Sequence, residues 1–375
     1  MATVKHHKVV AALPAVLEAN AIYYVRAGQG HDAYVTNGSG LIVGYPSNAQ
    51  LGLAELDPSG LPAIRPTLNL DFINRRFVDP RVTFARASGG GRFNAQGVYE
   101  WLPANTPRID YDPVTGECLG LLIEEQRTRL NTVALAPTAA QSVTVTAVAH
   151  TISFYGAGTI TLSGTHTATV AGSGAYPSRR TYTFTPTAGT LTITPTGDVQ
   201  MLQLETGLFA TSWIQGEGSQ VTRAADFASV NTLAPWYNPV EGTLFADVLR
   251  GDIVTKRTSG FVRFVGVDST NSIRLEPGIA WPTTERLYVT LDGNVQVQLT
   301  LGHAIPGGTS KLAAAYREND FGFSRNGAAT ISVNSGLIPD VQSMQIGQGM
   351  VSGHIRSIRY YPRRLSNTEL QALTA

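Results

Sequence analysis

The sequence has little that could crosslink it or steer it electrostatically. Its 375 residues include a single cysteine, Cys118, which excludes an internal disulfide and favours folding in a reducing compartment. Charged residues make up 15% of the chain, well below the ~25% of an average protein. The 28 basic residues nearly balance the 27 acidic ones, so nucleic acid is not an expected partner.

Long apolar runs and ligand clusters are also missing. No segment approaches the roughly 18 apolar residues of a membrane-spanning helix, so we expect no membrane insertion. The apolar run Val9–Pro14 is too short for a secretory signal. The histidines are scattered apart from His6 and His7, and none stands at zinc-ligand spacing from Cys118, so we expect neither a metal nor another cofactor.

Turn-forming residues and threonine-rich alternation dominate what remains. The chain has 38 glycines, 20 prolines and 43% hydrophobic residues, which is typical of an ordered, turn-rich β protein. Segments such as Ser142–Val148 and Thr190–Thr194 alternate apolar and hydroxyl side chains, the pattern of half-buried antiparallel strands. We therefore predict an all-β fold: a small N-terminal β-meander followed by jelly-roll or β-sandwich domains.

Shifts in composition divide the chain into four predicted parts. Strands are expected at Ala21–Arg26, Ala33–Thr36 and Leu41–Tyr45, and a capping box at Ser366–Glu369 predicts a short C-terminal helix. The predicted parts are an N-terminal meander with a linker (1–60), a connecting region (61–130), a threonine-rich β-sandwich (131–228) and a final β-sandwich (229–375).

The stretch Asp110–Leu130 concentrates charge behind an apolar run. Its carboxylates could form a glycosidase pair, but polar turns and ion pairs with neighbouring arginines explain them more simply. We expect Asp112 to cap a turn, and Leu121 and Ile123 to be buried. Four side chains are expected to form ion pairs, some of them between subunits: Glu124, Glu125, Arg127 and Arg129.

Several segments resemble tailed-bacteriophage virion proteins. Leu13–Gly38 resembles the start of many phage fibre proteins, and Lys311–Ala375 resembles the end of a concanavalin A-like (laminin-G-like) sandwich. The segments that resemble head-spike and tail-fibre proteins are Thr83–Ser88, Pro107–Gly116, Leu121–Thr128, Gln203–Glu205, Thr211–Ile214 and Val221–Asp226.

This resemblance implies a fibre, spike or decoration protein on the virion surface, made in the host cytoplasm. The implied partners are capsid or tail proteins of the same virion and further copies of the chain, which we expect to form a trimer. The 131–228 part would be like a carbohydrate-binding module, and the final sandwich concanavalin A-like with a short C-terminal helix. The meander would attach to the virion through Ile22, Tyr23, Tyr24 and Tyr34.

The expected activity is weak, multivalent binding to host-surface glycans, without catalysis. Aromatic rings stack on sugars while neighbouring polar groups bind hydroxyls, although aromatic residues in a β-sandwich more often belong to its core. Two alternatives stay open: a purely structural decoration protein and a glycan depolymerase. The residues expected at the glycan site are Trp281, Asn319, Asp320, Phe321, Arg325 and Asn326.

Overall fold

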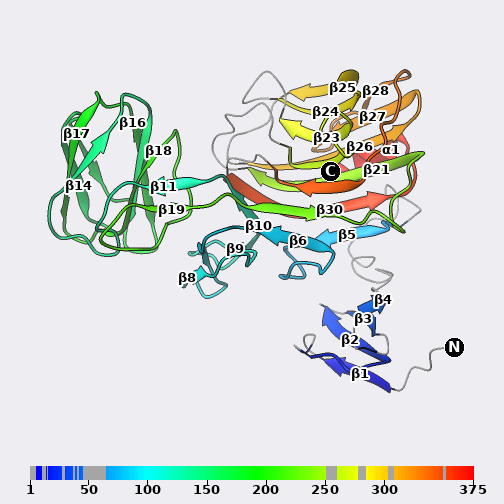
Figure 1. The fold of residues 1–375 in the computed structure, drawn as a ribbon, viewed down its shortest axis with the longest axis horizontal. Helices are drawn as coiled ribbons and strands as arrows, with labels where there is room; N and C mark the ends of the chain where they lie inside the picture. Colours follow the sequence, from blue (N-terminus) through cyan, green and yellow to red (C-terminus); the bar gives the residue numbers. More distant parts are fainter. Residues whose placement is uncertain are drawn as a thin grey trace.

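The computed structural model confirms the all-β class. It describes residues 6–10, 14, 16–27, 30–36, 39, 42–44, 65–250, 260–277, 284–302, 308–348 and 352–375. These residues form an N-terminal sheet, a large two-sheet sandwich and a second, smaller sandwich set to one side (Figure 1). Within the described ranges, no helix is long and apolar enough to cross a membrane.

The N-terminal sheet contains the three predicted strands and one more. The added strand, β1, pairs in parallel with β2, whereas the other pairs are antiparallel. Tyr23 and Tyr34 face each other across β2 and β3 and are buried beside Ala21, with Phe77 packed against them. The strands are β1 (His6–Val10), β2 (Ala21–Ala27), β3 (Gly30–Thr36) and β4 (Ile42–Gly44).

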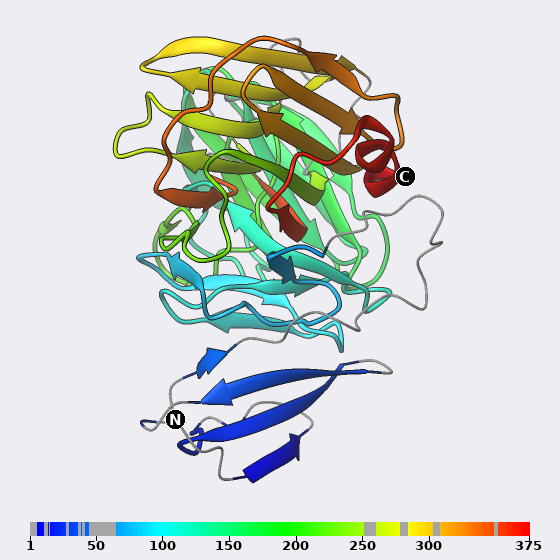
Figure 2. The same cartoon turned by 90° about the vertical axis from the view of Figure 1, so that its right-hand side faces the viewer.

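Two stacked sheets build the large sandwich (Figure 2). In the first sheet the order is β28 (Ile331–Val333), β27 (Asp320–Arg325), β26 (Thr309–Arg317), β21 (Glu241–Arg250), β30 (Ser352–Tyr361), β10 (Cys118–Glu124) and β9 (Ile109–Tyr111), with β5 (Leu68–Asp71) also paired to β30. In the second the order is β25 (Asn294–Gly302), β24 (Thr284–Leu291), β23 (Ser272–Pro277), β22 (Val262–Val265), β29 (Ser343–Ile346), β20 (Phe227–Val230) and β6 (Val82–Ala85).

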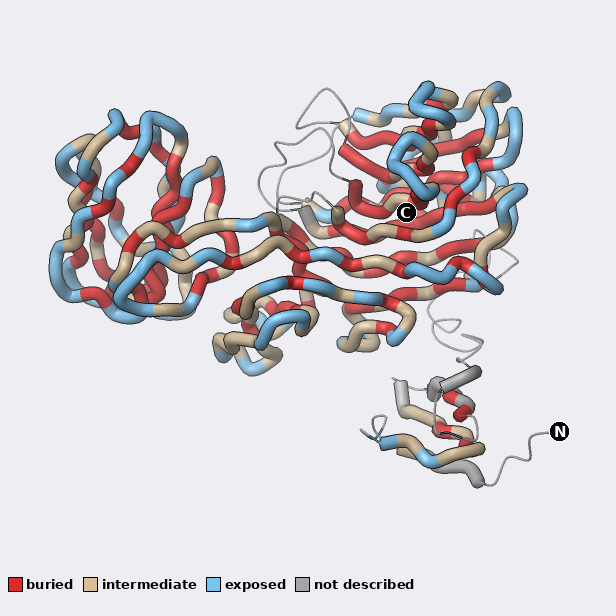
Figure 3. The backbone as a smooth tube through the Cα atoms, in the orientation of Figure 1, coloured by how far each residue is buried: buried red, intermediate tan, exposed pale blue. Residues whose placement is uncertain are grey.

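Period-2 alternation explains how these strands bury their apolar residues. Along β26, Leu312, Ala314 and Tyr316 point into the core between the two sheets. The intervening Ala313 and Ala315 point outward, where Leu370 and Leu373 of helix α1 (Asn367–Thr374) cover them. The predicted capping box is present, because Ser366 and Glu369 exchange hydrogen bonds at the start of α1. The large sandwich is therefore buried along its centre (Figure 3), and the helix covers part of the outer face of its first sheet.

The domain boundaries differ from the predicted ones. Residues 61–130 are not a separate connecting region, since β5, β9 and β10 pair within the first sheet and β6 pairs with β20 in the second. Sequence periodicity cannot reveal this, because the strand partners lie far apart in the sequence, as in the pairings of Val82 with Val230 and of Leu121 with Ile355. The large sandwich is thus assembled from two distant parts of the chain.

The smaller sandwich is inserted between those two parts. Its sheets enclose a separate core that includes Ile152, Phe154, Leu191 and Leu204, as the threonine-rich alternation predicted. A two-stranded ribbon, β11 (Arg127–Arg129) with β19 (Val221–Arg223), carries the chain in and out. The strands are β12 (Gln141–Val145), β17 (Gly189–Thr196), β14 (Thr159–Gly164) and β15 (Ala168–Ala171) in one sheet, and β16 (Arg179–Phe184), β13 (His150–Tyr155) and β18 (Gln200–Thr206) in the other.

A small hairpin lies beside the junction of the two sandwiches. It consists of β7 (Gly90–Phe93) and β8 (Tyr99–Leu102). Phe93 and Tyr99 pack with Trp213 and Tyr155 of the inserted sandwich, and the Tyr99 hydroxyl donates to the Trp213 carbonyl at 2.6 Å. The hairpin therefore supports the join from one side.

Candidate functional site at the joint of the two sandwiches

A buried cluster of charge lies where the ribbon leaves the large sandwich. We call it the joint network: Arg86, Arg108, Glu124, Arg223 and Asp226. All five side chains are at most 2% exposed, which is rare for charged groups and requires close pairing.

Asp226 lies at the centre of the joint network. Its Oδ1 accepts a hydrogen bond from Arg86 Nη1 at 3.1 Å. Its Oδ2 accepts from Arg108 Nη2 and, at 2.9 Å, from the backbone N–H of Glu124. Both carboxylate oxygens are therefore committed to partners in the same chain.

Glu124 connects the network to the inserted sandwich. Its carboxylate accepts from Arg108 Nη1 at 2.8 Å, and from the backbone N–H and hydroxyl of Ser212 at 2.7 and 2.6 Å. Because Ser212 belongs to the inserted part and Arg108 to the large sandwich, one buried carboxylate ties the two units together.

The electrostatics of the joint network favour the charged form of Glu124. Burial alone would raise the pKa of Glu124, but the guanidinium groups of Arg223 and Arg108 hold that pKa far below its ordinary value. Burial lowers the pKa of Arg86 and of Arg223. In this cluster three guanidinium groups share two carboxylates. Loss of either carboxylate would therefore leave three buried guanidinium groups with a single counter-charge.

The joint network brings together segments that the sequence placed far apart. Arg86 comes from Thr83–Ser88, Arg108 from Pro107–Gly116 and Glu124 from Leu121–Thr128, while Arg223 and Asp226 come from Val221–Asp226. Sequence reasoning named Glu124 and missed the other four. The segments that resemble phage proteins contain these four residues, but no local pattern indicates that Arg86 and Arg108 meet Asp226 more than 100 positions away.

The Asp110–Leu130 stretch behaves largely as expected. Leu121 and Ile123 are buried, and Asp112 caps its turn by accepting from the N–H groups of Val114 and Thr115, both at 2.8 Å. Asp110 binds His354 at 2.9 Å.

The expected ion pairs form within one chain. Glu125 binds Arg127 at 2.7 Å. The partners of Glu124 occupy both of its oxygens, which leaves none for a neighbouring subunit. Arg129 is buried and donates to the Gly216 carbonyl at 2.5 Å, so its expected role in ion pairs between subunits is wrong.

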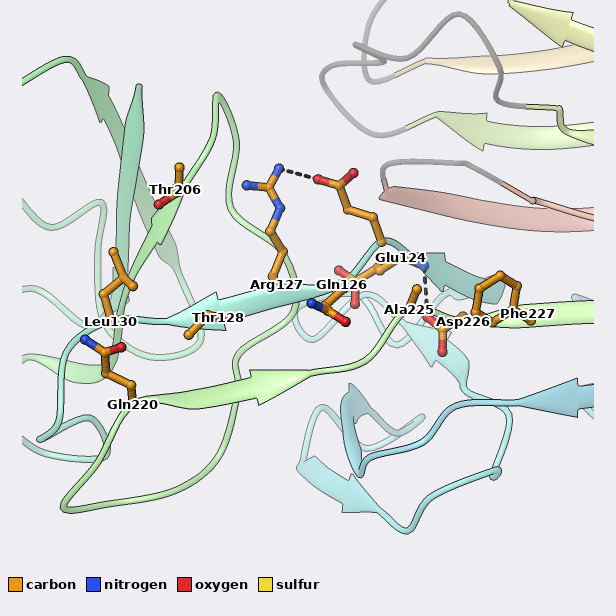
Figure 4. Close-up of a pocket in the computed structure, with 11 residues that line it drawn as sticks. Glu124, Gln126, Arg127, Thr128, Leu130, Thr206, Gln220, Ala225, Asp226 and Phe227 are labelled. Carbon is orange, nitrogen blue, oxygen red and sulfur yellow. Dashed lines mark hydrogen bonds and ion pairs between the residues drawn. The ribbon is translucent and has the colours of Figure 1, made fainter. Parts of the chain in front are cut away.

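An open groove of about 750 Å³ runs beside the ribbon (Figure 4). We call it the joint groove, lined by Glu124, Glu125, Gln126, Arg127, Thr128, Leu130, Thr206, Gln220, Ala225, Asp226 and Phe227. Gln126, Thr206 and Gln220 are exposed, and Phe227 is 52% exposed. The groove thus combines one accessible aromatic ring with amides and hydroxyls, above a charged floor that is already paired.

The residues predicted for a glycan loop do not come together. Asn319 and Asp320 lie at one end of β27 and Arg325 and Asn326 at the other, about 20 Å apart for a strand of this length. Phe321 is fully buried in the core, so its role in stacking on a sugar is a wrong prediction. Trp281 lies outside the described residues.

The polar members of that set have structural partners. Asp320 pairs with Arg317 at 2.6 Å and with Arg364 at 3.0 Å. Arg325 is buried and pairs with Glu285 at 2.5 Å. Asn319 and Asn326 occupy positive-φ turn positions, a backbone conformation that asparagine tolerates.

The side chains predicted for attachment divide between the two faces of the N-terminal sheet. Tyr23 and Tyr34 form its small core, with 1% and 2% exposure, and so cannot serve as surface contacts. Ile22 and Tyr24 lie on the other face and are half-buried, so their attachment role stays a prediction. In the described part of the chain, no group of three or more His, Cys, Asp or Glu residues could hold a metal ion.

Comparisons with known proteins give partial structural likenesses. One is the CBM40 module of an IT-sialidase from Ruminococcus gnavus, bound to α2,3-sialyllactose, which is 17% identical with a TM-score of 0.30. The match spans 37% of the present chain and 84% of that module. Another is domain 4 of AbnA, a GH43 arabinanase from Geobacillus stearothermophilus, in complex with arabinotriose, which is 12% identical with a TM-score of 0.32. This match spans 45% of the present chain and 84% of the domain. A Trypanosoma rangeli sialidase is 14% identical with a TM-score of 0.29, and the match spans 40% of the present chain and 25% of the sialidase.

Likenesses at this level assign neither a ligand nor an activity to the chain. No family model and no curated protein matches the sequence. Functional inference therefore depends on the geometry of the chain itself.

Proposed function

We propose that this protein is a non-enzymatic adhesion module of a phage fibre or spike, and that its joint groove binds host-surface glycans. The observation that carries the proposal is Phe227, which is 52% exposed and lines a groove together with Gln126, Thr128 and Gln220. A sugar ring has an apolar face, which suits an aromatic ring, and hydroxyls, which suit amides and hydroxyls.

The base of the groove favours binding over hydrolysis. Glycosidases need a carboxylic acid that can donate a proton, with a raised pKa, and a second free carboxylate. The pKa of Glu124 is shifted in the opposite direction, and Asp226 is shared among arginines. Glu125, the third carboxylate, pairs with Arg127. These carboxylates serve the architecture of the joint.

The virion part of the proposal draws on the sequence resemblance. The segments that resemble phage spike and fibre proteins supply the residues of the joint network, so in this chain they have a structural role. The N-terminal sheet would attach the chain to capsid or tail proteins, and a trimer would present several grooves. Multivalent presentation raises avidity by roughly 10²–10⁴ over a single weak site.

The test compares the intact protein with Phe227→Ala on an array of host-surface glycans. We expect the substitution to weaken binding about tenfold, as loss of one stacking contact does, without a change in thermal stability. Val267→Ala is the matched control, because Val267 is 87% exposed and lies outside the groove.

Each alternative function has its own outcome in this test. If the wild-type protein binds no host glycan and its removal weakens the particle, the protein is a structural decoration. If host polysaccharide is shortened on incubation with the protein, it is a depolymerase and the reading of the groove carboxylates is wrong.

A further inference from the structure

Three arginines lie side by side on the outer face of the second sheet. Strand pairing places Arg263 opposite Arg274, Arg274 opposite Tyr288, and Arg286 opposite Glu276. The alternate residues Val262, Leu275 and Leu287 are in the core, so these polar side chains project outward. We call Arg263, Arg274 and Arg286 the arginine row.

The side chains of the arginine row are held in fixed positions. Arg274 and Arg286 stack on Tyr288, with guanidinium carbons 4.6 and 4.1 Å from the ring centroid. Arg263 donates to the side-chain oxygens of Gln345 and Gln348, both at 2.5 Å. Such preorganised guanidinium groups lose little freedom when they bind an anion.

Charge in the arginine row is not balanced. Glu276 is the one carboxylate paired with it in the described residues, at 2.6 Å from Arg286 and 3.4 Å from Arg274. Arg274 Nε is buried and has no hydrogen-bond partner within those same residues. Arg274 and Arg286 keep 18% and 8% of their side-chain surface exposed. Three cations with one anion leave a site of net positive charge in a chain whose overall charge is nearly balanced.

The arginine row and the joint groove share one face of the molecule. Ser229 pairs with Gln345, and Gln345 pairs with Arg263. Phe227 is two residues from Ser229 on the same strand and so projects from the same side. From β20 to β24 the face crosses four strand spacings, roughly 19 Å at ~4.8 Å each, a distance that a short oligosaccharide can span.

We propose that the arginine row binds the anionic groups, carboxylate or sulfate, of acidic glycans. This inference rests on the proposed glycan-binding function and names the class of glycan. A planar guanidinium binds such an oxyanion through two parallel hydrogen bonds, which distinguishes acidic from neutral sugars. The aromatic ring of Tyr288 is covered by arginines on the row, which argues against single-stranded nucleic acid, since that ligand needs free rings for base stacking.

The experiment measures binding of the full chain to four defined probes. These are polygalacturonate, the same polymer with its carboxylates reduced to alcohols, dextran sulfate and single-stranded DNA, placed on an array that also carries neutral host-type glycans. Arg274→Gln removes one charge from the row, and Arg263→Gln is the second variant should the first fail to fold. Arg317→Gln, in an exposed ion pair on the other sheet, is the charge-matched control.

The proposal predicts binding to polygalacturonate or dextran sulfate, and the stronger of the two identifies the anionic group. Binding should weaken at least about tenfold with Arg274→Gln, as loss of a charge-assisted hydrogen bond does, and should be unchanged with Arg317→Gln. Carboxyl reduction should abolish binding to polygalacturonate. Higher salt should weaken the interaction, because ions screen partly exposed charges.

Other outcomes overturn the inference in distinguishable ways. Binding to neutral glycans alone, or equal binding by the wild type and Arg274→Gln, refutes the role of the arginine row and leaves the proposed glycan-binding function standing. Absence of binding to every glycan refutes both. Equal affinity for DNA, with the same sensitivity to Arg274→Gln, would show a general polyanion surface and refute the glycan assignment.

Discussion

Replacing Asp226 with asparagine tests whether the joint network holds the molecule together. The substitution preserves shape and removes one of two buried negative charges among three arginines. An asparagine amide must also direct its NH₂ group at a donor. In one orientation the NH₂ group faces Arg108 and the backbone N–H of Glu124, and in the other orientation it faces Arg86.

The expected cost follows from this burial. Removal of one partner from a buried, hydrogen-bonded ion pair typically costs about 3–5 kcal/mol, because the remaining charge is left uncompensated. For a domain of about 200 residues, each kcal/mol corresponds to roughly 2–4 °C, so Asp226→Asn should lower the melting temperature by about 6–20 °C. That loss is a large part of the ~5–15 kcal/mol that stabilises a typical domain.

Urea unfolding followed by circular dichroism gives the change in free energy, and hydrogen exchange locates it. We expect faster exchange in β10 and β19, on either side of the joint. Glu117→Gln is the control, because Glu117 lies in the same stretch but is 64% exposed and 3.9 Å from Arg356. The control should cost less than ~1 kcal/mol. An Asp226→Asn cost as small as that of the control would refute the view that the network is structurally essential.

Two further predictions concern the backbone and a buried acid. Gly120 forms a bulge in β10 with φ of +112°, and a Cβ there would lie 2.5 Å from the Ile355 carbonyl, so Gly120→Ala should cost about 2 kcal/mol in thermal unfolding. Gly218→Ala, with φ of +80° but open space around it, should cost only about 1 kcal/mol, and equal costs would exclude the steric explanation. Burial raises the pKa of Asp247, although the charge of Arg356 opposes this shift. The ionised acid therefore destabilises the fold at pH 7. This penalty shrinks as the pH falls through the raised pKa and is absent below the ordinary pKa of aspartate. Asp247→Asn should therefore raise the melting temperature at pH 7 but not at pH 3, and a lower melting temperature at pH 7 would contradict this sign.

Local patterns predicted the elements of this fold better than their assembly. Threonine alternation indicated the inserted sandwich, and the Ser366–Glu369 spacing indicated the terminal helix, because both signals depend on neighbouring residues. The insertion itself depends on pairings such as Leu121 with Ile355, for which one sequence carries no signal.

The candidate site shows the same limit. Glu124 was recognisable as an ion-pair residue, but Asp226 and Arg108 acquire their roles only when the two parts of the large sandwich meet. Phe321 was assigned to a surface loop because Asn and Asp precede it. In the folded chain strand alternation directs its ring into the core, while Phe227 keeps its ring exposed.

A crystal structure of the intact protein with its best-binding oligosaccharide would show whether the joint groove is the glycan site. We expect a sugar ring against Phe227, with hydroxyls hydrogen-bonded to Gln126 or Gln220 in the joint groove. A saccharide bound elsewhere, with the groove empty, would refute the groove as the glycan site even if the protein proved to be an adhesin.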